Sequence, residues 1–274
     1  MNRLAGRVAL VTGATYGIGT TILERLAEEG AAVVFTGRTA DKGLALEERL
    51  RSEGRQVHFA QGSAAQEDDV KAAVQSAVDT FGSLTIVVNN AAATDMTGPG
   101  RPDTHVADIE TDVFDNVMKT GVYGVLWSSK YAIPHMKAAG GGAIINITAA
   151  SSIRAIDGRP AYQASKGAMN ALTRQMAVDY GVDGIRSNAI VVGFTPTGGE
   201  VITKMVQNEE FIAAVKRAIP SPRLGRPIDI ANGVVFLASE EGEYVNGVLL
   251  PIDGGLTCKL GIPDTSALSA IMPS

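Results

Sequence analysis

Short apolar segments alternate with longer amphipathic stretches from one end of the chain to the other. Seven of these segments are rich in β-branched residues, which favour strands, and they lie at residues 7–12, 32–36, 56–61, 84–89, 142–148, 185–192 and 247–252. Segments such as VALV, TIVV and AIINI are apolar without alternation, which is typical of strands covered on both faces. The stretches between them carry apolar residues at helical spacing, and three of these stretches end in glycine, as helices often do.

This order of elements predicts a doubly wound α/β fold, in which about seven parallel strands form one sheet with helices on both faces. We expect residues 1–274 to form a single domain, because α/β sheets commonly reach this length and no linker or repeat interrupts the alternation. Two segments depart from the pattern: residues 92–111 are rich in Gly, Pro and Asp, and residues 195–222 are helical only in part. Both leave the carboxyl ends of predicted strands, where such sheets bind their ligands.

Composition and charge exclude several classes of partner. A net charge of -5 and a pI near 5.3 provide no basic surface for nucleic acid, and the chain has no run of about 18 apolar residues that could span a membrane. The first residues enter a strand without the apolar region of a signal peptide, so we expect a cytoplasmic protein. Cys258 is the single cysteine, and His58, His105 and His135 lack the spacing of metal ligands, so we expect neither an intramolecular disulfide nor a metal.

A glycine-rich turn, TGATYGIG at residues 12–19, follows the first predicted strand and opens a predicted helix. Backbone N–H groups and the helix dipole converge there, which suits the pyrophosphate of a dinucleotide. Gly13 allows the tight turn, Gly17 lets the cofactor approach the backbone, and Gly19 permits close packing of helix on sheet. Glycines that merely shape a turn are the alternative, but the strand–turn–helix context favours cofactor binding. The other predicted contacts in this turn are Thr15, Tyr16 and Ile18.

The TGxxxGxG spacing of this turn resembles that of the short-chain dehydrogenase/reductase family, and the resemblance continues from about residue 4 to residue 256. Residues 89–91 (NNA) resemble the family's NNAG element, although Ala92 replaces its glycine, and residues 162–166 (YQASK) resemble its YxxxK motif. The remaining similar segments are SNAI at 187–190, LGRP at 224–227 and DGG at 253–255. The resemblance implies a Rossmann fold and an oxidoreductase that transfers a hydride between a nicotinamide cofactor and an alcohol or ketone.

The resemblance also assigns roles to individual residues. Tyr162 would exchange a proton with the substrate oxygen, while Lys166, on the same helix face, would lower the pKa of the phenol and hold the nicotinamide ribose. Further cofactor contacts are implied at Ser63, Asn89, Ala91, Gly193 and Thr195, and at Tyr162 itself. A homotetramer is implied as well, in which predicted helices at 113–136 and 161–180 pack across one interface, and the apolar tail at 258–274 could cross to another subunit.

The residues after the second predicted strand indicate which dinucleotide is bound. An acidic residue there would favour NAD(H), because it accepts hydrogen bonds from both ribose hydroxyls and repels a 2′-phosphate. The alignment with the family places Gly37 at this position, and Arg38 follows, whose guanidinium can hold a phosphate. We therefore expect NADP(H) to be favoured over NAD(H). Against this, Tyr16 stands where many NADP(H)-dependent members have a second basic residue, and Ser63 stands where the family often has an Asp against the adenine.

Two residues of the family's catalytic set are replaced. The catalytic Ser would fall at Ala149, 13 residues before Tyr162, and the proton-relay Asn would fall at Gly121. Ser151 is our preferred substitute for the missing hydroxyl, because in an extended chain it would face the same side as Ala149, and Ser152 is the other candidate. Gly121 is interpreted as a packing glycine that lets a neighbouring helix approach.

These replacements leave three functional classes open. The preferred one is an oxidoreductase with a non-standard catalytic set that includes Ser151. The second is a dinucleotide-binding protein that catalyses a non-redox acid/base reaction, such as an elimination or cyclisation, and the third is a dinucleotide sensor. Residues 195–222 resemble the family's substrate lid and favour a small apolar substrate. Its apolar residues, which line a pocket or form ordinary helix core, are Val201, Ile202, Met205, Val206, Phe211 and Ile212.

Overall fold

The structure is a computed structural model, and it describes residues 2–198 and 200–259 of the chain. Within these residues, seven parallel strands form one sheet in the order β3-β2-β1-β4-β5-β6-β7. The strands are β1 (Val8–Val11), β2 (Ala32–Gly37), β3 (Val57–Gln61), β4 (Ile86–Asn89), β5 (Gly142–Ala149), β6 (Ile185–Val192) and β7 (Leu249–Ile252). The prediction of a doubly wound parallel sheet is therefore confirmed.

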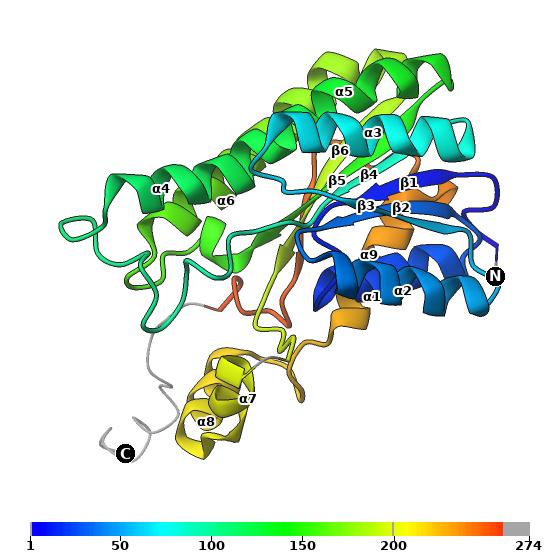
Figure 1. Cartoon of the computed structure of the whole chain (residues 1–274). Helices are drawn as coiled ribbons and strands as arrows, with labels where there is room; N and C mark the ends of the chain where they lie inside the picture. The colour runs from blue at the N-terminus through cyan, green and yellow to red at the C-terminus, as the bar shows by residue number, and fades with distance from the viewer. Residues whose placement is uncertain (1, 199, 260–274) are drawn as a thin grey trace, which may run out of the picture.

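The central strands are buried on both faces. In β1, Ala9 and Val11 belong to one core cluster while Val8 and Leu10 belong to the other, because successive side chains of a strand point to opposite faces. Helices α1 (Ile18–Glu28), α2 (Ala40–Ser52) and α9 (Pro227–Ala238) cover the first face, and α3 (Glu67–Phe81), α5 (Gly124–Ala138) and α6 (Pro160–Tyr180) cover the second (Figure 1). This double burial explains why the strand sequences are continuously apolar.

The winding of the sheet reverses between β1 and β4, because the chain runs from β1 toward β3 on one side and from β4 toward β7 on the other. Ligands of open α/β sheets bind at the carboxyl edge of such a switch point. Residues 92–110 leave β4 at this edge and lead into α4 (Thr111–Met118). The predicted lid contains α7 (Glu200–Gln207) and α8 (Glu209–Ala218), which lie apart from the two helix layers (Figure 1).

Some boundaries differ from the predicted ones. The helix predicted at 113–136 is divided into α4, a π-helical turn (Lys119–Tyr123) and α5. After β5 the chain turns at once into a 3-10 helix (Ala150–Ser152). The predicted tail lies outside the described residues from residue 260 onward. Among the described residues, the helices are too short or too polar to cross a lipid bilayer.

Candidate active site

The glycine-rich turn joins β1 to α1 at the switch point, as the sequence predicts. Gly13 has a φ of 64° and Gly17 has a φ of 65°, a conformation that L side chains rarely adopt. A Cβ atom on Gly13 would lie 2.9 Å from Ala91 Cα, and one on Gly17 would lie 3.2 Å from Thr197 Cβ. Within the described residues no side chain caps the start of α1. The turn therefore offers uncapped N–H groups in a cradle that side chains would fill, and a pyrophosphate fits these features.

The loop after β4 is bonded directly to this turn. Asn90 Nδ2 donates to the carbonyl oxygens of Thr12 at 3.0 Å and Gly13 at 2.9 Å. The N–H groups of Asn90 and Ala91 both donate to Thr12 Oγ1, at 3.1 Å and 3.2 Å. A side chain on Gly19 would overlap the amide of Asn90, so the third glycine serves this contact. Ala91 lies beside the turn, and its contact with the cofactor stays a prediction. The role of Asn90 in holding the turn was not predicted, because it depends on contacts between segments far apart in the chain.

The start of the lid lies against the glycine-rich turn at residues 12–19, which is called the phosphate turn from here on. Tyr16 is 54% exposed, and a Cβ atom on Gly198 would lie 3.4 Å from its hydroxyl, while Ile18 packs onto the core below. The predicted Thr195 lies beside Gly225, where a Cβ atom would come within 2.5 Å of Thr195 Oγ1. Its Oγ1 is buried and has no hydrogen-bond partner among the described residues, so it suits a polar ligand group. Gly193 N–H donates to a β7 carbonyl at 3.2 Å and joins the lid to the sheet.

The residues that follow β2 and β3 are those that the family resemblance predicts to lie beside the adenosine of the dinucleotide. A Cβ atom on Gly37 would overlap Thr15 Cγ2, so a side chain at this position would require Thr15 to move. Arg38 forms an exposed ion pair with Asp95 of the loop after β4, with 3.0 Å between Nη1 and Oδ2. Exposed pairs are weak and exchange partners readily, so Arg38 remains available to a phosphate. The hydroxyl oxygen of Ser63 accepts one backbone N–H at 3.3 Å.

Asn89 belongs to a buried network rather than to the groove. Its Oδ1 accepts from Ser128 Oγ at 2.6 Å, and its Nδ2 donates to Asn146 Oδ1 at 2.8 Å. Asn146 Nδ2 in turn donates to Thr173 Oγ1 at 2.8 Å. Asn89 is 3% exposed, and breaking a buried network is costly. The side chain of Asn89 thus joins β4 to β5 and, through Asn146, to α6, and its contact with the cofactor stays a prediction.

Tyr162 and Lys166 lie one turn apart on α6, with Lys166 Nζ 5.7 Å from the centre of the Tyr162 ring. Lys166 is 3% exposed, and its Nζ donates to the carbonyl oxygen of Ile147 in β5 at 2.7 Å. Burial lowers the pKa of this ammonium to about 8. Burial raises the pKa of the Tyr162 phenol, and the nearby charge of Arg159 opposes the rise. The sequence suggests that Lys166 lowers the pKa of the Tyr162 phenol. In the structure this pKa is raised, because burial of the phenol is the larger effect.

The hydroxyls that follow β5 have different surroundings. Ser152 Oγ donates to the carbonyl oxygen of Ala149 at 2.6 Å and accepts from Asn170 Nδ2 at 2.8 Å. Ser151 Oγ is buried and has no hydrogen-bond partner among the described residues. The argument that Ser151 shares the strand parity of Ala149 is wrong, because the chain leaves the extended conformation at Ala150. Of the two hydroxyls, only that of Ser151 lacks a hydrogen-bond partner among the described residues, and its catalytic role stays a prediction.

Gly121 lies in the π-helical turn between α4 and α5 and faces α6. A Cβ atom there would lie 3.1 Å from both Cβ and Oγ of Ser165, and Ser165 Oγ donates to the carbonyl oxygen of Tyr162 at 2.8 Å. The interpretation of Gly121 as a packing glycine is confirmed. Single π-helical turns often occur at functional sites, and no feature of the local sequence predicted this one.

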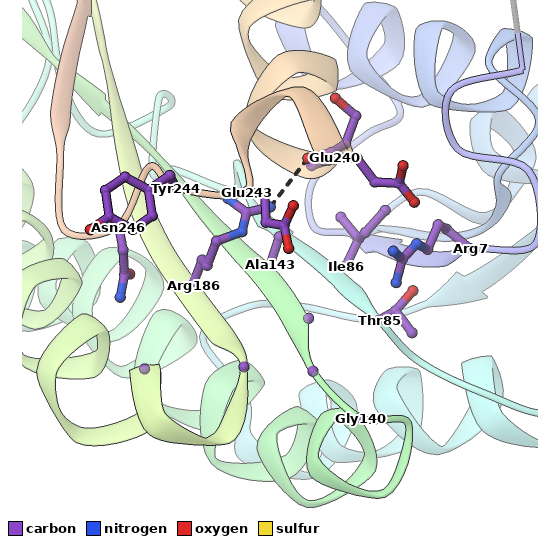
Figure 2. A pocket seen from close by; sticks show the side chains of 16 residues that line it. Arg7, Thr85, Ile86, Gly140, Ala143, Arg186, Glu240, Glu243, Tyr244 and Asn246 are labelled. Atoms are coloured by element: carbon purple, nitrogen blue, oxygen red, sulfur yellow. Dashed lines mark hydrogen bonds between the residues drawn. The ribbon is translucent and has the colours of Figure 1, made fainter.

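A cleft of about 750 Å³ lies at the opposite, amino-terminal edge of the sheet (Figure 2). Arg7 and Arg186 enter it from opposite sides, and Glu240 and Glu243 line it as well (Figure 2). Two carboxylates balance two guanidinium groups, so the lining favours neither an anion nor a cation. The phosphate turn, Tyr162 and Ser151 all lie beyond the carboxyl ends of the strands, and they define the candidate active site.

Comparisons with known proteins identify the family of this chain. A family model described as Enoyl-(Acyl carrier protein) reductase matches residues 13–257. The chain is 34% identical to a 7alpha-hydroxysteroid dehydrogenase of Clostridium sardiniense over 266 residues, which cover 97% of this chain and 98% of the relative. It is 36% identical to a probable short-chain type dehydrogenase/reductase of Bradyrhizobium diazoefficiens over 264 residues, 93% of this chain and 89% of the relative.

A solved structure shares the fold. It is a gluconate 5-dehydrogenase from Burkholderia cenocepacia J2315 in complex with NADP and tartrate, with a TM-score of 0.84 and 33% identity over 94% of this chain and 98% of that one. The matches run through the phosphate turn, the YxxxK motif and nearly the whole sheet. The chain therefore belongs to the short-chain dehydrogenase/reductase family and is a nicotinamide-dependent oxidoreductase that transfers a hydride.

Proposed function

We propose that this oxidoreductase exchanges a hydride between NADP(H) and a small, mainly apolar alcohol or ketone, with Tyr162, Lys166 and Ser151 acting on the substrate oxygen. The buried hydroxyl of Ser151, which has no partner among the described residues, is the observation that carries the proposal. A buried hydroxyl is unfavourable unless a partner completes its hydrogen bonds, and in this proposal the substrate oxygen is that partner. We also propose a cytoplasmic location, because the exposed, unpaired thiol of Cys258 is typical of a reducing compartment.

Each side chain has a separate task in this proposal. The nicotinamide supplies the hydride chemistry when it is bound. Tyr162 gives a proton to the substrate oxygen during reduction and removes it during oxidation. The ammonium of Lys166 favours the phenolate that forms when Tyr162 gives up its proton, which offsets part of the cost of burying that charge. Ser151 donates a hydrogen bond to the same substrate oxygen and stabilises the charge that develops on it.

The lid supports an apolar substrate. The aromatic rings of Phe194 and Phe211 meet edge to face, with 5.6 Å between their centres. Ile202, Met205 and Ile212 on α7 and α8 are only partly buried, which favours a role in lining a pocket over a role in the helix core. The side chain of Val201 lies outside the described residues. A panel of hydroxysteroids, gluconate and simple secondary alcohols, assayed with both oxidised cofactors, tests the function. Turnover of none of them, or of gluconate alone, would contradict the proposed substrate class.

The cofactor preference is tested by titrating NADPH and NADH while nicotinamide fluorescence is followed. Arg38→Ala should weaken NADPH binding by about tenfold or more and leave NADH unchanged, because a charge-assisted contact to the 2′-phosphate is lost. Asp95→Asn should tighten NADPH binding by about twofold to fivefold, because it removes a competing carboxylate from Arg38. NADH that binds wild type at least as tightly as NADPH would contradict the proposal.

We propose a homotetramer in which α4 to α6 form one of the interfaces. Tyr123 is 49% exposed and Leu126 is 46% exposed, and Trp127 packs beside Tyr123 with 5.4 Å between the ring centres. Aromatic residues clustered on an exposed helix face are typical of interfaces. Light scattering at micromolar concentration should give about four times the chain mass, and Leu126→Glu should shift the protein toward smaller species. A wild-type monomer would exclude this assembly.

A further inference from the structure

The first turn of α6 is capped by a residue from a distant part of the chain. The first N–H groups of a helix have no acceptor within it. In α6 the first residue is a proline without an N–H, and Gln163 N–H donates to the carbonyl oxygen of Arg159 at 3.1 Å. The remaining two groups donate to one carboxylate, Ala161 N–H to Asp103 Oδ1 and Tyr162 N–H to Asp103 Oδ2, both at 3.0 Å. Every N–H group in this turn therefore has an acceptor.

No local residue could take over this task. The side chain of Arg159 forms no capping bond, and the first turn of α6 contains no acidic residue. Asp103 is 1% exposed, and a buried carboxylate is costly unless hydrogen bonds and nearby positive charge compensate it. Here two backbone amides and the positive end of the helix dipole supply that compensation. Asp103 thus provides acceptors for the first N–H groups of α6, and these N–H groups in turn stabilise its buried carboxylate.

Asp103 is itself held by the loop after β4. Its N–H donates to the carbonyl oxygen of Met96 at 2.9 Å, and a β-bridge joins Asp103 to Thr97. The same loop begins at Asn90 and Ala91, whose bonds to the phosphate turn were described above. One short segment therefore connects the cofactor groove at its start with the catalytic helix at Asp103.

We propose that Asp103 is a positioning residue for the reaction, which sets the place of Tyr162 relative to the nicotinamide by holding the backbone of Tyr162 to the loop that borders the cofactor. The inference rests on the proposed role of Tyr162 in proton exchange. A reacting group displaced by about 1 Å can lose about 10²-fold in rate, so even a small shift of this turn affects turnover. Binding of the cofactor depends much less on the cap, because the glycine-rich turn at the other end of the loop would hold the pyrophosphate and Lys166 lies one helical turn beyond Tyr162.

The test compares three variants of the full chain with a substrate from the panel above. Asp103→Ala removes both acceptors, Asp103→Asn keeps one carbonyl oxygen, and Asp108→Ala removes an exposed carboxylate of the same loop as a control. Turnover is expressed per NADPH-binding site, counted by fluorescence titration. We expect kcat to fall about 10-fold to 100-fold in Asp103→Ala and by a smaller factor in Asp103→Asn. KM and the Kd for NADPH should stay within about twofold, and Asp108→Ala should match wild type.

A wild-type kcat per binding site in both Asp103 variants overturns the inference. The inference is also overturned if activity and the number of NADPH-binding sites fall by the same factor. The carboxylate would then be needed only for folding. If Asp103→Ala does not fold, Asp103→Asn carries the comparison.

If wild type turns over no substrate, the proposed function has failed instead. Hydrogen exchange then tests whether Asp103 caps α6. The amides of residues 161 and 162 should exchange at least about tenfold faster in Asp103→Asn than in wild type, and unchanged exchange contradicts the cap.

Discussion

Tyr162→Phe is expected to lower kcat by about 10³-fold while the Kd for NADPH changes by less than about threefold. The variant keeps the ring and the backbone bond to Asp103, and it removes only the hydroxyl that exchanges a proton with the substrate. Loss of a group that acts only in the transition state lowers kcat and leaves the binding of the cofactor intact. Steady-state kinetics and a fluorescence titration on the same preparation measure the two quantities.

Tyr180→Phe, at the other end of α6, is the matched control, because its ring packs at the surface near Lys137 and it should retain wild-type turnover. More than a tenth of wild-type kcat in Tyr162→Phe would show that another group moves the proton. Gly17→Asp is the complementary change, since it places a carboxylate and a side chain in the phosphate cradle. It should abolish NADPH binding. A protein that only senses the dinucleotide would lose its output in Gly17→Asp and keep it in Tyr162→Phe.

Ser151→Ala carries the second largest expected effect, a fall in kcat of about 10²-fold with unchanged affinity for NADPH. The loss of one hydrogen-bond donor to a developing oxyanion typically has this size. The hydroxyl has no partner among the described residues, so its removal should cost little folding free energy and should leave the thermal midpoint nearly unchanged. Kinetics and a thermal melt together separate a catalytic hydroxyl from a structural one.

Ser152→Ala is the control for this change. Its hydroxyl already donates to the carbonyl oxygen of Ala149 and accepts from Asn170, so it should lower stability rather than the rate of the chemical step. Ala149→Ser in the Ser151→Ala background should restore part of the lost turnover, because it returns a hydroxyl to the family's usual position. Wild-type kcat in Ser151→Ala would show that Ser151 is not the donor and would favour a reaction that needs none.

Much of the fold could be predicted from the spacing of apolar and polar residues along the chain. Continuous apolar runs such as VALV predicted strands buried on both faces, since a strand with one solvated face would alternate. The phosphate turn was predictable because the required geometry permits only glycine at Gly13 and Gly17, which leaves a local sequence signal. The pairing of Tyr162 with Lys166 was predictable because four residues make about one helical turn.

Only the tertiary structure decided which of the remaining polar groups are free and which are engaged. Asn89 was assigned to the cofactor, but its carboxamide lies in a network with residues 39 and 57 positions away. Ser151 and Ser152 are adjacent in sequence, and the 3-10 turn after β5 leaves only one of them without a partner. Asp103 reaches α6 across 58 residues, and Arg38 meets Asp95 across 57. Contacts of this kind depend on the path that loops take across the edge of the sheet, and this path cannot be predicted from the local sequence.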